Sequence, residues 1–593
     1  MASFLAMYFS EIITILLVIA LVVVLYKDYL RAAFAFLITA FVFLILQIIR
    51  PEEFLAGLAN KQIMVIFLLI GLTAGIQRNI GTGFFFRLFS QKLGPGAFRI
   101  RMMVLVSSLS AVLNNTPVVA FMIPYVKEWA AVNKYPASKF LIPLSYSTIL
   151  GGMITVIGTS TNLVLNGLIS QYNLPILGFA DFLFLGLLVT VVGVIYLGFF
   201  SHYLLPDREE NKSEVIQHLN EYVVETYVPD GSKMAGKTVK EAGLRNLKEI
   251  FLAEISRDGQ EISPVSPKEV LRAGDKLFFT GNTKAILTLI QEENGLTLPE
   301  ESHVTQNAFF QLTEAVVPAS SSLIGEKVKN SDFRKRYQAS IISIHRNGEI
   351  IKGNIGETRL QAGDLLLMLT GKNSLQSDQP KDLIIITLQG EIQPERKKGK
   401  KLPSLLAIVI LILGIVGVMD LFMAAFTGII ILYVFKVLNL ATLRKSVDLD
   451  LLLILVSSLA IGTALKNSGA ANLLAEGILW LTNGSGGMLS LVVLFVLTLL
   501  LTSLITNAAA VSIMFPLALE MGTQLGLPLT PFFVTIAFAA SGDFMTPIGY
   551  QTNLMVMGPG NYKFKDYFKV GLPLTILYSA TVLLFVRWYY GIG

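Results

Sequence analysis

Long apolar segments alternate with short polar breaks at both ends of this chain of 593 residues. The apolar segments are about 20 residues long, which is the length of a helix that spans the hydrocarbon core of a bilayer. The pattern predicts five spans and one re-entrant hairpin in each of two regions, residues 1–205 and 402–593. The expected spans lie at 8–26, 29–48, 62–77, 139–162 and 181–204, and at 403–419, 421–437, 449–465, 531–556 and 567–590, with hairpins at about 100–130 and 488–520.

Two polar tracts interrupt the apolar pattern of each region, and the tracts of the two regions match. Asn115 stands nine residues before Pro124, and Asn507 stands nine residues before Pro516. The second tracts are Ile157-Gly158-Thr159-Ser160-Thr161-Asn162 and Ile548-Gly549-Tyr550-Gln551-Thr552-Asn553. The offset between matching positions is 392 residues in the first tract and 391 in the second. A nearly constant offset indicates an internal duplication.

Polar residues with Gly and Pro at membrane depth predict interrupted helices around a binding site. Backbone groups freed by a helix break are tolerated in hydrocarbon only where they line a cavity enclosed by protein. The exposed N–H groups and the helix dipole can bind an anion without Lys or Arg, and neither hairpin tip carries either residue. Backbone carbonyls near Gly158 and Gly549 suit Na⁺. The alternative is that Asn and Thr only form hydrogen bonds between packed helices.

The distribution of basic residues predicts the topology. They flank loops on one side of the expected spans, at Lys127, Lys134 and Lys139 in the first region and at Lys563, Lys565 and Lys569 in the second. By the positive-inside rule these loops are cytoplasmic. The prediction is therefore a plasma-membrane protein with residues 205–402 inside and both termini outside. Two regions with an odd number of spans then have opposite orientations, so they form inverted repeats whose hairpin tips meet near the midplane.

Composition sets the class independently. Hydrophobic residues make up 53% of the chain and charged residues only 15%, against about 25% charged in soluble proteins, and the mean hydropathy is +0.64. The net charge of +6 lies largely in loops between spans, so no nucleic-acid partner is expected. The absence of Cys excludes disulfides and thiolate metal sites. The spans offer almost no acids, histidines or nucleophiles that could form a catalytic cluster, so we expect no enzyme and no cofactor.

The middle of the chain, residues 207–400, is rich in charges and strand patterns and is itself duplicated with a period of 89 residues. Pro229 matches Pro318 and Gly274 matches Gly363. The predicted fold is therefore an all-α polytopic membrane protein with two small α+β cytoplasmic domains, residues 216–298 and 305–385, inserted between its repeats. Amphipathic stretches at 79–94 and 470–484 are expected to form helices along the membrane interface.

The tracts resemble those of the divalent anion/sodium symporters, the Na⁺-coupled sulfate and dicarboxylate carriers of the ion-transporter superfamily. The family carries Ser-Asn-Thr at its hairpin tips and a turn like Gly-Thr-Pro-x-Asn in its broken helices. This chain has Asn114-Asn115-Thr116 and Thr506-Asn507-Ala508 at the tips. It also has the hydroxyl residue that the family places four positions before each tip motif, at Ser110 and Thr502. The resemblance covers residues 1–205 and 402–593.

The resemblance implies two Na⁺ sites, a substrate site, a homodimer and an elevator-like movement of the hairpin-bearing part. One Na⁺ site would use Ser110, Asn114, Asn115 and Gly158, and the other would use Thr502, Asn507 and the carbonyl of Gly549. The substrate would contact Asn115, Thr116, Thr159, Asn507 and Tyr550. Na⁺ is then the coupling ion.

The departures from the family pattern bear on the substrate. Ala508 removes one hydroxyl at the second tip, and Tyr550 and Gln551 replace a small Thr-Pro pair. The added bulk favours a compact oxyanion such as sulfate over a four-carbon dicarboxylate. A dicarboxylate symporter, an efflux exchanger of the same superfamily and a channel gated by the cytoplasmic domains remain the alternatives.

Asp543 is the one acid near the second broken helix. It is therefore a candidate coupling residue, either a cation ligand or a proton carrier; the alternative is a structural cap.

The inserted domains resemble the C-terminal ligand-binding module of potassium-conductance regulators, RCK-C. That resemblance implies a small regulatory ligand such as a cyclic dinucleotide, with dimerisation as the alternative.

Overall fold

The computed structural model describes most of the chain, and every structural statement below refers to these residues. They are 9–27, 29–30, 32–79, 93–208, 223–244, 250–257, 260–262, 265–281, 296, 310–318, 321–337, 339–346, 349–351, 355–371, 382–386, 401–439, 443, 449–481 and 486–592. The amphipathic stretch expected at 79–94 lies almost entirely outside them.

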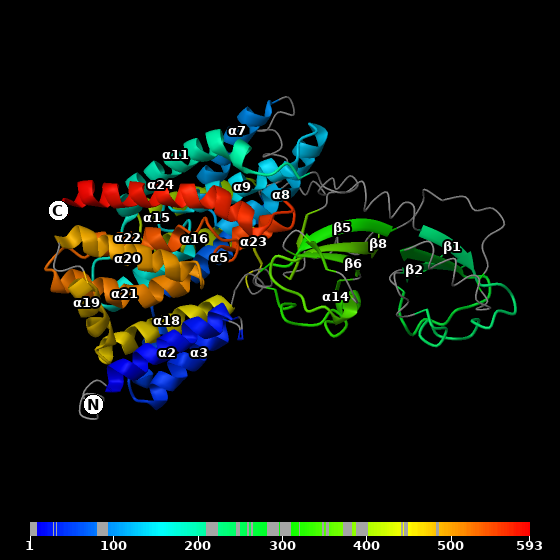
Figure 1. The fold of residues 1–593 in the computed structure, drawn as a ribbon, viewed down its shortest axis with the longest axis horizontal. Helices are drawn as coiled ribbons and strands as arrows, with labels where there is room; N and C mark the ends of the chain where they lie inside the picture. Colours follow the sequence, from blue (N-terminus) through cyan, green and yellow to red (C-terminus); the bar gives the residue numbers. More distant parts are fainter. Residues whose placement is uncertain are drawn as a thin grey trace.

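Helices make up both hydrophobic regions (Figure 1). Those of the first region are α2 (Phe9–Tyr26), α3 (Ala32–Ile45), α4 (Pro51–Leu58), α5 (Lys61–Asn79), α7 (Pro95–Ser110), α8 (Asn115–Val132), α9 (Leu141–Gly152), α10 (Ser160–Gln171) and α11 (Phe179–Leu204). Those of the second are α15 (Lys401–Ile415), α16 (Leu421–Val434), α18 (Leu449–Asn467), α19 (Ala470–Leu481), α20 (Gly486–Thr502), α21 (Asn507–Gln524), α22 (Thr530–Ser541), α23 (Gln551–Met557) and α24 (Phe564–Tyr590).

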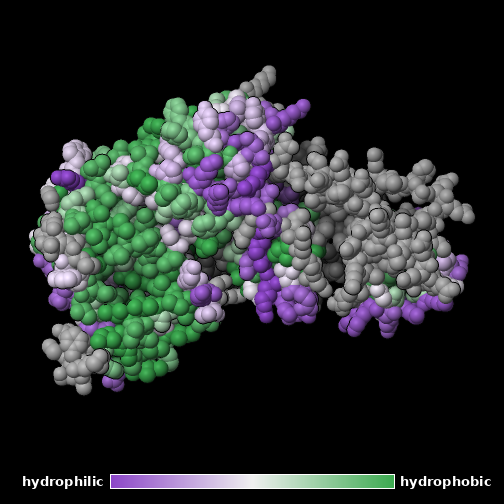
Figure 2. Space-filling view, in the orientation of Figure 1, coloured by the Kyte–Doolittle hydropathy of each residue, from purple (hydrophilic) through white to green (hydrophobic). Residues whose placement is uncertain are grey.

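The described helices fit a polytopic membrane protein. Four are long and apolar enough to cross a membrane, at 9–26, 51–73, 179–204 and 564–590, or five if the bent pair of α18 and α19 counts as one span. Five further apolar helices are shorter. The pair is bent by 70° at its break, so the described part of the predicted amphipathic stretch, residues 470–481, forms a helix that leaves the direction of the preceding span. Apolar side chains cover much of the visible surface of the helical body, as a lipid environment requires (Figure 2).

The helices pack in two groups. The hairpin group consists of α7–α11 and α20–α24, in which α9 packs on α7, α8 and α11, α24 packs on α11, and α23 packs on α8 and α9. The outer group consists of α2–α5, α15, α16 and α18, in which α18 packs on α3 and α4, and α16 packs on α15 and α5. The groups meet where α21 contacts α18 and where α10 contacts α5, and α19, which follows α18, also packs on α21.

Two small antiparallel sheets lie between the helical regions in sequence and to one side of the helical body in space (Figure 1). The first has the order β1-β4-β2-β3, from β1 (Val223–Tyr227), β4 (Lys276–Gly281), β2 (Ile250–Arg257) and β3 (Gln260–Ile262). The second has the order β7-β6-β8-β5-β9, from β7 (Glu349–Ile350), β6 (Ala339–Arg346), β8 (Leu365–Gly371), β5 (Phe310–Val316) and β9 (Ile384–Ile385), with the short α14 (Phe333–Tyr337) beside it. The domain boundaries given above stay predictions.

The sheets repeat one detail that the sequence period of 89 residues marks. In the first sheet Arg257 Nε donates to Asp275 Oδ1 at 2.8 Å, and in the second Arg346 Nε donates to Asp364 Oδ1 at 2.7 Å. Both carboxylates are fully buried, and each forms a bidentate pair of hydrogen bonds with its arginine. In the first sheet this bonding raises the pKa of the Arg257 guanidinium above its ordinary value.

Candidate functional site

Both hairpins break at the tips that the sequence predicts. Helix α7 ends at Ser110 and α8 begins at Asn115, while α20 ends at Thr502 and α21 begins at Asn507. Polar side chains cap the helices that start there, because the first N–H groups of a helix have no partner within it. Asn114 Oδ1 accepts from Thr116 N at 3.4 Å, and Thr506 Oγ1 accepts from Ala509 N at 3.4 Å.

The two broken helices contain the same turn. In the first, the Gly158 N–H donates to Thr155 Oγ1 at 3.2 Å, and Asn162 Nδ2 donates to Thr155 O at 3.1 Å. In the second, the Gly549 N–H donates to Thr546 Oγ1 at 3.2 Å, and Asn553 Nδ2 donates to Thr546 O at 3.1 Å.

These contacts explain why each helix stops and restarts. A threonine hydroxyl and an asparagine amide satisfy the backbone groups that the break leaves unpaired. Thr155 and Thr546 were not among the predicted site residues, although their spacing of 391 residues could have identified them.

The first tip and the first broken helix form a compact cluster. Ser110 Oγ donates to Asn115 Oδ1, and both side chains are buried. A Cβ at Gly152 would lie 2.6 Å from Asn115 Oδ1 and 3.1 Å from the Gly158 carbonyl oxygen. Only glycine at 152 therefore lets these two oxygen-bearing groups approach each other across the broken helix.

Side chains of the second region complete this first cluster. Asn115 Nδ2 donates to the Tyr550 hydroxyl at 2.6 Å, and Thr159 Oγ1 lies 3.4 Å from the same hydroxyl. Beside them, Thr116 Oγ1 donates to Gln551 Oε1 at 3.1 Å. The structure therefore joins positions that lie 435 residues apart in sequence, at the point where α8 and the broken second helix meet.

The second tip and the second broken helix bring together oxygen atoms. Thr502 Oγ1 donates to the Ala540 carbonyl at 2.7 Å and lies 2.8 Å from the end of the Asn507 side chain. The same end of Asn507 is 3.0 Å from Gly549 O and 3.3 Å from Ala540 O.

The chemistry of this second cluster depends on the rotation of the Asn507 amide. With its nitrogen toward the cluster, Asn507 donates hydrogen bonds to all three neighbouring oxygens. With its oxygen there, the cluster is a set of neutral oxygen ligands, which a hard cation such as Na⁺ can hold together.

Asp543 lies directly beside the second cluster. Its carboxylate is fully buried, and it accepts hydrogen bonds from Thr546 Oγ1 at 2.7 Å and from Ser503 Oγ at 3.4 Å. A Cβ at Gly549 would lie 1.7 Å from Asp543 Oδ2, so the carboxylate presses on the Gly549 backbone. Within the described part of the chain no Lys or Arg forms an ion pair with it. A buried carboxylate without a cationic partner is unfavourable unless a cation or a proton compensates it.

The structure thus gathers most of the predicted site residues into two adjoining clusters. Ser110, Asn115, Thr116, Thr159 and Tyr550 share the first cluster with the Gly158 backbone, and Thr502, Asn507 and Gly549 share the second. The peptide that joins Gly549 to Tyr550 links the clusters, because Gly549 lines the second and the Tyr550 hydroxyl reaches the first.

One predicted ligand lies differently. The Asn114 side chain is exposed and caps α8, so its oxygen points to the helix start rather than to Ser110. Ser145, which was not predicted, donates to Thr552 Oγ1 at 2.9 Å and to Asn553 Oδ1 at 2.7 Å. It lies in the predicted span 139–162, which gave no signal for this contact.

Comparisons with known proteins identify the family. The model of the CitMHS family, citrate transporter, matches residues 14–476 and, in a second match, residues 408–592. A Chlamydomonas reinhardtii protein named for regulation of the sulfur deprivation response is 34% identical over 548 residues, 89% of this chain and 93% of that protein. An uncharacterised transporter of Synechocystis is 32% identical over 575 residues, 94% of this chain and 93% of that protein.

A third relative carries a substrate in its name. Sodium/sulfate cotransporter 1 of Chlamydomonas reinhardtii is 26% identical over 391 residues, 62% of this chain and 44% of that protein. The family description and the names of the Synechocystis transporter and the sodium/sulfate cotransporter agree with the expectation of a membrane transporter rather than an enzyme. The chain belongs to the citrate transporter family of membrane-spanning transporters.

Proposed function

We propose that this transporter is a Na⁺-coupled symporter of a small divalent oxyanion, with sulfate as its substrate. The observation that carries the proposal is the adjacency of two clusters around Gly549 and Tyr550. The second cluster, around Asn507, is rich in oxygen ligands, and the first, around Asn115, is rich in neutral hydrogen-bond donors. A cation and an anion that bind side by side lower the electrostatic cost of each other's binding, which couples the two binding events.

The second cluster is the proposed site of a coupling Na⁺. Asn507 Oδ1, Thr502 Oγ1 and the carbonyls of Ala540 and Gly549 are hard oxygen groups, as Na⁺ prefers. Asp543 adds the negative charge that neutral oxygens lack, and the Na⁺ in turn compensates a carboxylate buried without a cationic partner in the described chain. Asp543 is therefore proposed as a charged ligand or immediate neighbour of this Na⁺.

A second Na⁺ is proposed at the first tip. Ser110, Asn115 Oδ1 and the Gly158 carbonyl are its ligands, and Asn114 contributes by capping α8 rather than by direct contact. Gly152 occupies the place that Asp543 takes in the other half of the chain. The first Na⁺ site is therefore neutral and the second is charged, so the two sites are expected to differ in affinity.

The anion is proposed to bind between the two tips. Asn115 Nδ2, the Tyr550 hydroxyl, Thr116 Oγ1 and Thr159 Oγ1 are donors at the first cluster, and Asn507 contributes from the second. The N-terminal ends of α8, α10 and α21 lie at the same breaks, where unpaired N–H groups and helix dipoles favour negative charge. Neutral donors suit an anion whose charge is balanced by bound Na⁺.

The relatives and the tyrosine favour sulfate within this class. Proteins that share 26–28% identity with this chain are named sodium/sulfate cotransporters. The buried Tyr550 ring and the Gln551 side chain occupy the space beside Asn115 and Thr116, where a longer dicarboxylate would place its second carboxylate.

The transport cycle is proposed to follow from two inverted repeats. The repeated turns at Gly158 and Gly549 support a duplicated architecture. The packing of the helices into a hairpin group and an outer group supports an elevator-like movement of the first against the second. We place residues 205–402 in the cytoplasm of a plasma-membrane homodimer, with both termini outside.

Parallel uptake assays in proteoliposomes test the proposal. Labelled sulfate and labelled succinate are each offered with Na⁺ or with choline outside. The proposal predicts Na⁺-dependent sulfate uptake that an excess of unlabelled sulfate abolishes and that succinate competes with only weakly. If the protein takes up succinate but not sulfate, its substrate is a dicarboxylate and not sulfate. If sulfate uptake is equal in Na⁺ and in choline, Na⁺ is not the coupling ion.

A further inference from the structure

The second of the two sheets docks directly on the hairpin group. We call residues 310–386 the second sheet unit and residues 223–281 the first sheet unit. The second sheet unit lies next to the helical body, and the first lies beyond it (Figure 1). Lys127 on α8 forms an ion pair of 2.6 Å with Glu314 on β5. A Cβ at Gly363 would lie 3.7 Å from the Leu554 Cβ on α23, and a Cβ at Gly558 would lie 2.7 Å from the Leu365 Cβ.

Apolar residues seal this contact. Successive side chains of a strand point to opposite faces of a sheet. Ala315 and Leu366 belong to the core of the second sheet unit itself. Their neighbours Val316 and Leu365, together with Ile386, belong to the continuous apolar core of the helical body. The sheet therefore buries both faces, one in its own unit and one against the helices.

The first sheet unit provides a built-in comparison, because its positions are related to the second by the offset of 89 residues. Val316 and Leu365 correspond to Tyr227, which is half-buried, and Lys276, which is exposed. Gly363 corresponds to Gly274, and a Cβ at Gly274 would meet nothing within 4 Å. Core-facing positions such as Leu277 and Leu366 are apolar in both copies. At the outer-face positions of Val316 and Leu365, the copy that contacts the helices carries the more apolar side chains.

The docking contacts fall on the helices that begin at the candidate site. Leu554 lies one turn after Tyr550, and its N–H donates to the Tyr550 carbonyl at 3.3 Å. Lys127 lies on α8 roughly 18 Å from Asn115 at 1.5 Å of rise per residue. Hydrogen bonds from Asn115 and Thr116 join α8 to Tyr550 and Gln551 at the site. The second sheet unit joins the same two helices again near their other ends.

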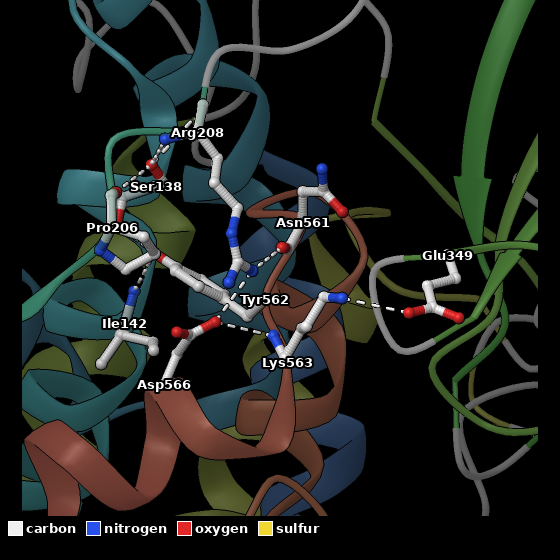
Figure 3. A network of polar contacts seen from close by, with 9 residues as sticks. All are labelled: Ser138, Ile142, Pro206, Arg208, Glu349, Asn561, Tyr562, Lys563 and Asp566. Atoms are coloured by element: carbon white, nitrogen blue, oxygen red, sulfur yellow. Dashed lines mark hydrogen bonds and ion pairs between the residues drawn. The ribbon is translucent and has the colours of Figure 1, made fainter.

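A weaker contact extends the docking to α24 (Figure 3). Glu349 Oε1 lies 3.0 Å from Lys563 Nζ, and the Lys563 N–H donates to Asp566 Oδ2. Asp566 also pairs with Arg208 at 2.8 Å. The Glu349–Lys563 pair is exposed, so it contributes little. The Lys127 and Glu314 side chains are only 9% and 16% exposed, and separating a buried pair of this kind is costly.

We propose that the second sheet unit is a brace that ties α8 to α23 and thereby restrains the separation of these helices by which the site opens to bind and release the anion. This opening takes place within the hairpin group, between Asn115 and Tyr550, and is distinct from the elevator-like movement of the whole group. Release of the second sheet unit therefore speeds transport, and any signal that the inserted residues receive acts on transport through this contact. The proposal rests on the proposed transport function.

Disulfide trapping tests the brace in the full-length protein, which has no cysteine of its own. Gly363→Cys combined with Leu554→Cys places the two Cβ atoms 3.7 Å apart, close to the mean of about 3.8 Å in disulfides. We expect the disulfide to form in proteoliposomes under mild oxidant. Mass spectrometry of peptides detects it, and this measurement does not depend on sulfate transport. Oxidation then lowers Na⁺-driven sulfate uptake by about tenfold, the size of a typical coupling between two states, and reductant restores it.

Matched controls separate docking from strain. Gly363 and Gly274 both have positive φ, +85° and +92°, so cysteine strains either position. Gly363→Cys alone and Gly274→Cys alone are expected to transport equally in oxidant and reductant. Lys127→Glu is expected to raise the uptake rate severalfold by weakening the docking, and Glu314→Lys in the same chain returns the rate toward that of the unaltered protein.

Three results would overturn the brace. The disulfide fails to form, the oxidised pair transports as fast as the reduced pair, or Lys127→Glu slows uptake instead of raising it. Because disulfide formation is read chemically, a failed brace remains distinguishable from a failed assignment of sulfate as the substrate.

Discussion

The Asn115 side-chain nitrogen donates a 2.6 Å hydrogen bond to the Tyr550 hydroxyl, across 435 residues of sequence. The two residues belong to different polar tracts, one at a hairpin tip and one at the restart of a broken helix. Their contact links the candidate anion site to the oxygen cluster behind Gly549.

Removal of the Tyr550 hydroxyl is expected to weaken anion binding. In Tyr550→Phe the ring stays and the hydroxyl that Asn115 and Thr159 contact is lost. A hydrogen bond to a charged group contributes about 1.5–3 kcal/mol, so the KM for sulfate should rise at least about tenfold. Tyr578→Phe is the control, because that buried hydroxyl donates to Phe538 O instead. An unchanged KM in Tyr550→Phe would place the anion elsewhere.

Neutralising Asp543 is expected to weaken the coupling cation. Asp543→Asn keeps the size of the side chain and removes the buried charge beside Gly549. The Na⁺ concentration for half-maximal sulfate uptake should rise at least about tenfold. Asp566→Asn removes another buried carboxylate, one that pairs with Arg208 at the start of α24, and should leave the Na⁺ dependence as it is. If Asp543→Asn keeps the Na⁺ dependence of the unaltered protein, its carboxylate is structural.

A methyl group at position 549 is expected to disrupt the second cluster. In Gly549→Ala the new Cβ would lie 1.7 Å from Asp543 Oδ2 and 3.0 Å from Thr502 O. Overpacking costs about 1–3 kcal/mol, so Na⁺-dependent uptake should fall by about tenfold or more. Gly477→Ala on α19, where a Cβ meets nothing within 4 Å, should transport normally. Normal uptake by both variants would contradict the role of the Gly549 backbone.

Acidification is expected to loosen the second sheet unit. Burial lowers the pKa of His345 on β6 below its ordinary value of 6.5, and the neighbouring Glu314 opposes this shift. Between the two pKa values the unfolded chain binds more protons, so the stabilisation is complete above pH 6.5 and is lost as the pH falls below it. The protection factors of the amides in residues 339–346, which correct for the intrinsic pH dependence of hydrogen exchange, should therefore fall below pH 6.5 more in the unaltered protein than in His345→Gln. An equal fall in both proteins would assign the loss of stability to groups other than His345.

The helix breaks could be predicted from the sequence because their signals are local. Gly158 and Gly549 mark turns, and Asn115 and Asn507 start helices, in a pattern that the duplication repeats. Backbone hydrogen bonds and caps depend on near neighbours, so the residue types at these positions largely determine them.

The contacts between distant residues could not be predicted in the same way. The rotation of Asn114 toward Thr116 N depends on the geometry of one turn, and the Ser145 contact with Asn553 depends on how α9 packs on α23. The docking face of the second sheet unit can be recognised from the sequence, since Val316 and Leu365 are apolar where Tyr227 and Lys276 stand in the matching copy. This difference indicates that the face is covered, but only the packing shows which helices cover it.

Accumulation of sulfate against its gradient tests the central claim most directly. Proteoliposomes are loaded with labelled sulfate at the external concentration, and an inward Na⁺ gradient is then imposed. The account predicts that internal sulfate rises above the external level in the unaltered protein, rises about tenfold more slowly in Gly549→Ala, and stays level in choline. Sulfate that never exceeds equilibrium under a Na⁺ gradient, with the protein folded and inserted, would contradict a site shared by Na⁺ and the anion.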